Sequence, residues 1–179
     1  MKKSLFLLMI ALALSYRCLA DSGVVLREKS ERTLQDLYKT NSAAQAIGGS
    51  AIAVLVFPEV YAGGFLAAIQ RGDGVLYKNG EVQGYYNTSS LSFGFQAGVQ
   101  KFSYALFFMD ENSLNYLKNS EGFELGVAPS LVVADTGFNR SISTTTLHEG
   151  IFGFFFDQTG LMGGVSIQGT KITKYSPSR

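Results

Sequence analysis

The sequence predicts an α+β fold, with an N-terminal amphipathic helix packed on a strongly curved, mostly antiparallel β-sheet that forms a partial barrel or a sandwich. Between residues 22 and 46, apolar residues recur at spacings of three and four, which is the period of one helix face. From residue 51 onward the pattern changes to short apolar or alternating runs separated by turn residues, which is typical of strands. A leading helix followed by many strands favours an α+β domain.

The predicted N-terminal helix has an apolar side and a charged side. The apolar side contains three leucines, Leu26, Leu34 and Leu37. Asp21 or Ser22 is the expected N-cap, and Gly48-Gly49 is the expected stop. Because the polar side mixes acids with bases, packing on the sheet is favoured over lying in a membrane interface.

The stretch 84–109 contains the clearest strand patterns. From Leu91 to Val99 every second residue is apolar, and the residues between them are Ser, Gly and Gln. This alternation predicts a strand with one polar face. Residues 105–109 then run apolar without a break, which predicts a strand buried on both faces.

Turn residues divide the chain before this stretch. An apolar strand at 51–57 is expected to end at Pro58, which cannot donate a ladder hydrogen bond. The segment Arg71-Gly72-Asp73-Gly74 is expected to be a tight turn that closes a strand at 65–70.

Asn79-Gly80 gives the strongest local signal, because this pair suits a two-residue type I′ hairpin turn. The hairpin places Lys78 opposite Glu81. The pattern of residues 110–119 predicts a short helix, with an N-terminal cap and a late lysine. The remaining strand candidates are 123–134, 150–156 and 161–172.

The first twenty residues are typical of a secretory signal. Lys2 and Lys3 precede an apolar run at 5–14, and small residues end at Ala20. We expect residues 1–20 to be a cleaved signal peptide and residues 21–179 to form one domain. The protein is then exported, and we expect it in the periplasm or peripherally associated with the outer membrane.

Cleavage also changes the charge of the chain. Of fifteen basic residues, Lys2, Lys3 and Arg17 leave with the signal, so twelve face fourteen acidic residues and the net charge becomes about −2. This balance argues against nucleic-acid binding. Cys18, the single cysteine, lies in the signal. Lipidation of Cys18 stays an alternative, although Arg17 stands where a lipid-acceptor site has a small residue.

Residues that could support catalysis are few. His148 is the single histidine and no G-x-S-x-G motif occurs, so we expect no catalytic residue, no metal and no cofactor. The Asp-Thr-Gly sequence at Asp135 resembles the aspartic-protease motif, whose chemistry needs two carboxylates. A dimeric aspartic hydrolase that uses Asp135 is therefore an alternative function, with a hairpin turn the favoured interpretation.

A small outer-membrane β-barrel is another alternative. A signal peptide, plentiful Gly, Tyr and Phe, and an alternating strand are what such barrels show. Against it, the runs at 105–109 and 152–156 have no polar face.

Several ordered blocks between residues 51 and 172 resemble one family. The blocks are Val54-Leu-Val-Phe-Pro-Glu59, Gly84-Tyr-Tyr-Asn87, Phe95-Gln-Ala-Gly-Val-Gln100, Leu106-Phe-Phe-Met109, Gly160-Leu-Met-Gly-Gly-Val-Ser166 and Gly169-Thr-Lys-Ile172. Together they are similar to the SYLF family of lipid-binding domains, in its secreted bacterial branch.

The resemblance implies a non-enzymatic module of the cell envelope that binds phospholipid or an anionic membrane surface. Eukaryotic members bind phosphoinositides and actin, so an unidentified protein partner is also compatible. By this resemblance, the expected lipid-binding residues are Arg27, Lys29, Arg32 and Lys39 on the helix, Tyr85, Tyr86 and Asn87 in the central block, and Lys171. A solvated sheet edge is the alternative role for Lys171.

Overall fold

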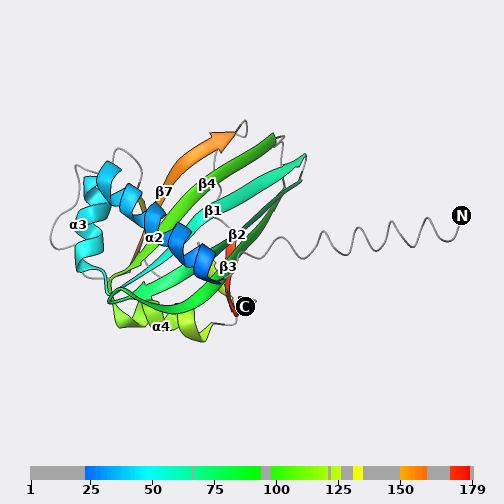
Figure 1. Ribbon diagram of the computed structural model, residues 1–179. Coiled ribbons are helices and arrows are strands. Elements are labelled where there is room, and N and C mark those ends of the chain that lie inside the picture. Colours follow the sequence, from blue (N-terminus) through cyan, green and yellow to red (C-terminus); the bar gives the residue numbers. More distant parts are fainter. Residues whose placement is uncertain are drawn as a thin grey trace, which may run out of the picture.

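Helices flank an open β-sheet in this protein (Figure 1). The computed structural model describes residues 23–65, 67–93, 98–120, 122–125, 131–134, 150–160 and 170–177. The helices are α2 (Gly23–Thr40), α3 (Ser42–Ser50) and α4 (Glu111–Asn119). The strands are β1 (Ala53–Phe65), β2 (Ala67–Lys78), β3 (Glu81–Phe93), β4 (Gly98–Phe108), β5 (Phe123–Leu125), β6 (Leu131–Ala134), β7 (Ile151–Gly160) and β8 (Thr170–Tyr175). The predicted α+β class is confirmed.

The described strands form one sheet in the order β5-β8-β3-β2-β1-β4-β7-β6. Every pair is antiparallel except β6 and β7, and no pairing joins the two outermost described strands. Strands β1 to β3 follow one another as a meander, and β4 returns to the free side of β1. This is the Greek-key order, so β4 lies far from β3 although the two are adjacent in sequence.

The N-terminal segment is two helices where one was predicted. Asn41 has an extended backbone (φ −134°, ψ 102°), and its side-chain oxygen accepts a hydrogen bond from the Ala44 amide at 3.0 Å. Asn41 therefore caps a new helix, as its side chain favours. Gly48 and Gly49 do not stop the helix as predicted, because α3 continues through them to Ser50.

Two predicted strand ends lie inside longer strands. β1 continues past Pro58, where the register with both neighbours shifts between Val56 and Val60. Such a bulge is a position where a strand tolerates proline. The predicted turn at 71–74 was wrong, because these residues lie within β2. A Cβ on Gly74 would stand 2.6 Å from the Val56 carbonyl oxygen, so close backbone approach explains this glycine.

The predicted Asn79-Gly80 hairpin is confirmed. Asn79 and Gly80 have φ of 53° and 78°, and Lys78 pairs with Glu81 across the turn. The predicted helix after the central stretch is also confirmed, with Asp110 as its N-cap.

The central stretch 84–109 divides into two strands. The predicted single alternating strand from Leu91 to Val99 was wrong, because β3 ends at Phe93 and β4 begins at Gly98, with β2 and β1 lying between them in the sheet. The prediction for residues 105–109 was right: all five are buried, with exposed fractions of 7% or less.

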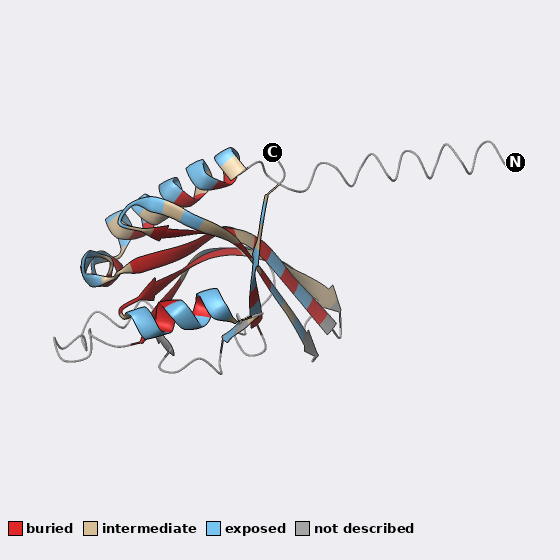
Figure 2. Cartoon of the chain, turned by 90° about the horizontal axis from the view of Figure 1, so that it is seen from below, coloured by how far each residue is buried: buried red, intermediate tan, exposed pale blue. Residues whose placement is uncertain are grey.

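The sheet has apolar residues on both faces. The face toward α2 and α3, here called the outer face, buries Val56, Val75 and Phe107 against Leu37 and Ile47. The inner face packs against α4 and contains a stack of Phe57, Tyr104 and Phe155. Tyr104 is fully buried, and its hydroxyl is 2.7 Å from that of Thr88. Figure 2 shows the strand ends projecting beyond the helices.

Candidate functional site

The outer face beyond α2 carries a row of cationic side chains. Strand pairing aligns Lys171 of β8 with Ser89, Ser89 with Arg71, Arg71 with Tyr61, and Tyr61 with Lys101 of β4. We call Lys171, Arg71 and Lys101 the cationic row. These three cations share one register row of the outer face, and the row continues on β5 with Glu124 opposite Lys171.

Strand alternation points these cations outward. Arg71 is exposed while its neighbours Gln70 and Gly72 are buried, and Lys171 alternates in the same way with Thr170 and Ile172. Among the described residues, no carboxylate forms an ion pair with Arg71 or Lys171. Both positive charges are therefore available to an anionic ligand.

Lys101 is tied to the helix through a carboxylate. Glu59 lies between Lys101, whose Nζ is 2.6 Å from one carboxylate oxygen, and Lys29 of α2, at 3.3 Å from the other. The hydrogen bond from Lys101 lowers the pKa of Glu59, although partial burial of the carboxylate opposes this shift. The positive charge of Lys29 lowers the pKa further. The same bond raises the pKa of Lys101. Lys101 Nζ also lies 5.9 Å from the centre of the Tyr61 ring.

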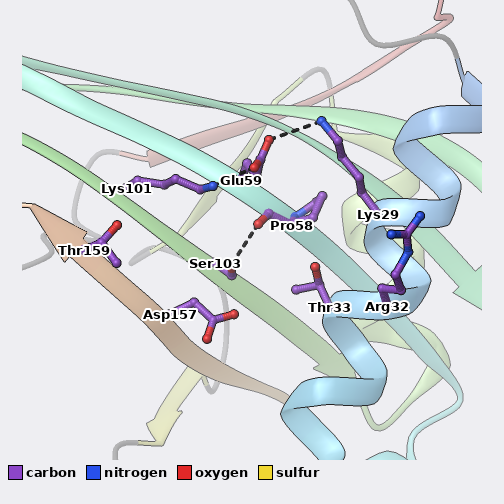
Figure 3. A pocket seen from close by; sticks show the side chains of 9 residues that line it. All are labelled: Lys29, Arg32, Thr33, Pro58, Glu59, Lys101, Ser103, Asp157 and Thr159. Carbon is purple, nitrogen blue, oxygen red and sulfur yellow. Dashed lines mark hydrogen bonds and ion pairs between the residues drawn. The ribbon is translucent and has the colours of Figure 1, made fainter.

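A cavity of about 410 Å³ opens between α2 and the sheet beside Lys101 (Figure 3). Lys29 and Arg32 line it from the helix, and Lys101 and Glu59 line it from the strands. Figure 3 shows Lys29 reaching from α2 to Glu59 across this cavity. Asp157, from β7, contributes a second acid. The cavity is thus lined by three cations and two anions and extends the cationic row toward the helix.

The other predicted helix cations are paired within the helix. Arg27 lies 3.6 Å from Glu31, Arg32 lies 3.7 Å from Glu28, and Lys39 lies 2.9 Å from Asp36. These are exposed pairs, which contribute little to stability but offset the charge locally. Among the predicted helix residues, Lys29 is the one paired with the sheet.

Tyr85, Tyr86 and Asn87 do not form one site. Tyr86 is 1% exposed in the inner core, whereas Tyr85 and Asn87 lie on the outer face. The Asn87 amide donates to Gly72 O at 3.1 Å and to Asp73 Oδ1 at 2.8 Å, so it joins two strands. The Tyr85 hydroxyl donates to Gly23 O at 3.4 Å, at the start of α2.

The described residues offer no cluster of three His, Cys, Asp or Glu side chains suited to a metal ion. Of the described helices, none has the length and apolar character needed to cross a membrane. Asp135, His148, Cys18 and the whole predicted signal lie outside the described residues.

Comparison with known families bears on these observations. Residues 89–177 match a family model, Ysc84, described as "Las17-binding protein actin regulator". Residues 89–177 belong to the SYLF family. SYLF membership indicates a binding module with a lipid-binding role. The SYLF segment contains β4, β7 and β8, and therefore includes Lys101 and Lys171 of the cationic row. No curated protein matches the chain.

Sequence reasoning found Lys171 but missed Arg71 and Lys101. Arg71 was assigned to a turn. Lys101 comes directly after an alternating strand pattern, and the sequence does not show which strand pairs with that strand. Their alignment depends on the pairing of β1 with both β2 and β4. No local signal marks either residue, because Arg71 is in phase with the apolar Ile69 and Lys101 with the apolar Val99, two positions away on the same strand.

Proposed function

We propose that this protein is an exported, non-catalytic module of the cell envelope that binds phospholipid through anionic headgroups. The observation that carries the proposal is the cationic row on an uncovered sheet face, within a chain that has a SYLF segment. Arginine and lysine attract headgroup phosphates, at about 1 kcal/mol per residue near an anionic surface. The free charges of Arg71 and Lys171 contribute most.

Binding to vesicles tests the proposal. The full chain co-sediments with vesicles that contain phosphatidylglycerol at low salt, and less with phosphatidylcholine vesicles. Binding falls as salt rises, because the attraction is screened. Equal binding to both vesicle types, or none to either, contradicts the proposal.

Paired substitutions locate the headgroup contacts. Replacing both Arg71 and Lys171 by glutamine removes two charges and lowers the affinity about thirtyfold at low salt. The control is Lys118→Gln, which removes one exposed charge from α4, the helix on the inner face. Arg32→Gln with Lys39→Gln tests the helix instead. A loss confined to the helix variant would place the headgroup contacts on α2.

Export is tested separately. In a bacterium that expresses the chain, mass spectrometry of the periplasmic and membrane fractions finds a protein that begins at Asp21. A cytoplasmic protein that retains Met1 contradicts the export proposal. A mature N-terminus at a lipid-modified Cys18 favours the lipidation alternative.

A further inference from the structure

A row of exposed apolar side chains lies directly beyond the cationic row. Strand pairing aligns Leu91 of β3 with Ile69, Ile69 with Gly63, and Gly63 with Val99 of β4. The exposed fractions are 55% for Leu91, 64% for Ile69 and 68% for Val99. We call Leu91, Ile69 and Val99 the apolar row. It crosses four adjacent strands, which span roughly 14 Å at the spacing of a sheet.

Exposure of this row is unusual for the protein. Farther along the same strands, apolar residues of the outer face are covered by α2 and α3; Val56, Val75 and Phe107 are each 0% exposed. Large contiguous apolar surface on a protein marks a place where something binds.

The order of the two rows fits a lipid interface. The rows are two residues apart along each strand, which is roughly 7 Å. Interfacial amphipathic helices bury their apolar face about 5–10 Å into the boundary between headgroups and acyl chains, which is a depth of the same order. Tyr61 is 52% exposed and lies between Arg71 and Lys101, at the level where aromatic residues favour the interface.

We propose that the strand ends of β1 to β4 insert the apolar row into the acyl boundary of an anionic bilayer. Arg71, Lys101 and Lys171 then contact the headgroup phosphates, and Tyr61, in the same register row, lies at the headgroup level between Arg71 and Lys101. This inference rests on the proposed phospholipid binding and adds to it the site, the depth and the orientation. The sheet meets the membrane with its strand ends, and the N-terminal helix stays outside.

The charges favour a bilayer over a second copy of the chain. Two copies that met through this face would bring two cationic rows together, and like charges in contact oppose association. An anionic bilayer instead offers phosphates to the cations and acyl chains to the apolar row.

Tryptophan fluorescence tests the depth of insertion. The chain contains no tryptophan, so each single substitution is the sole indole reporter. Ile69→Trp and Val99→Trp place it in the apolar row, and Val24→Trp is the matched control on α2, with a side chain 61% exposed. Each variant is mixed at low salt with phosphatidylglycerol vesicles that contain acyl-brominated lipid. We expect a blue shift and strong quenching at positions 69 and 99, and little at 24.

The outcomes separate this inference from the proposed function. Co-sedimentation without quenching at 69 or 99 overturns the insertion and leaves headgroup binding intact. Quenching at 24 alone overturns the orientation and places α2 in the bilayer. A blue shift at 69 that rises with protein concentration without vesicles assigns the row to a second copy. Absence of co-sedimentation overturns both proposals.

A second variant removes the apolar row without a fluorophore. Ile69→Ser, Leu91→Ser and Val99→Ser together lower the affinity for these vesicles at least about tenfold. The thermal midpoint stays within a few degrees of the wild type, since all three side chains are exposed. Val24→Ser is the control and leaves the affinity unchanged. Unchanged affinity in the triple variant contradicts the inference.

Discussion

The outer face of the sheet has two regions that differ in what covers them. Under α2 and α3, Phe107 is fully buried; eight residues earlier on the same strand and the same face, Val99 is 68% exposed. Both are apolar residues at equivalent alternating positions. The difference shows that strand alternation determines which face a side chain occupies. Coverage by α2 and α3 determines whether that side chain is buried or exposed.

The largest expected effect comes from truncating one apolar side chain in each region. Phe107→Ala leaves a cavity under the helices and lowers the free energy of unfolding by about 3–5 kcal/mol. Val99→Ala on the uncovered region changes it by about 0.5 kcal/mol or less. Urea unfolding followed by circular dichroism measures both. A similar loss for Val99→Ala would mean that its face is covered in solution.

The next largest effect on stability is expected at the boundary between the regions, where β2 approaches β1 closely at Gly74. In Gly74→Ala, the new methyl group would stand 2.6 Å from Val56 O and from Phe57 Cδ1. We expect a loss of about 1–3 kcal/mol in unfolding free energy. Gly49→Ala is the control, because nothing lies within 4 Å of its Cβ position. A stable Gly74→Ala variant would show that β1 and β2 can separate there.

A half-buried helix cap, Asp110, on the inner side of the covered region adds a pH-dependent effect. Asp110 accepts hydrogen bonds from the Gly150 amide at 2.7 Å and from the Ser113 amide at 2.8 Å. Burial would raise its pKa, but these hydrogen bonds outweigh burial and lower it. Asp110→Asn keeps one oxygen that can cap α4 but replaces the oxygen that accepts from the Gly150 amide by an NH2 group, and should cost about 1–2 kcal/mol at pH 7.

This contribution has a definite pH window. Because the folded pKa of Asp110 is lowered, the stabilisation is complete above its unfolded pKa of about 4 and is lost as pH falls through the folded value. Urea unfolding at pH 7 and at about pH 2.5 should therefore show a smaller difference between wild type and Asp110→Asn in acid. An undiminished difference in acid would assign the loss to packing.

The smallest expected effect on stability is at Glu59, which joins the two regions. Its side chain is 33% exposed, so Glu59→Gln costs about 0–1 kcal/mol. It also removes the carboxylate that pairs with Lys101, and affinity for anionic vesicles rises about fivefold at low salt. Asp36→Asn removes one acid on α2 and is the control. Weaker vesicle binding by Glu59→Gln would mean that Lys101 needs Glu59 to be positioned.

Strong local sequence patterns were sufficient to predict much of the fold. The unbroken apolar run of β4, the Asn79-Gly80 turn and the Asp110 cap each depend on a few neighbouring residues, and all three are confirmed. Asn41 was missed because a cap inside a helical period leaves the apolar spacing almost unchanged.

The candidate site was less predictable, since it depends on pairing between distant strands. A period of two from Leu91 to Val99 continues through two strands that are not neighbours. The pattern could show neither this division nor that both residues face solvent. Arg71 and Lys101 are thirty residues apart, and the position of Tyr61 between them follows from the sheet order alone.

The bulge at Pro58 has a consequence for how this surface can change. β1 uses one more residue there than either neighbour, between Val56 and Val60, and Ser103 donates its hydroxyl to the Pro58 carbonyl at 2.7 Å. Alternation therefore restarts after the bulge, and Tyr61 faces outward where an unbroken strand would face it inward. The bulge therefore separates the inward–outward alternation of the two parts of β1. Natural variation or protein engineering can substitute the residues beyond the bulge while the hydrophobic interior keeps its packing.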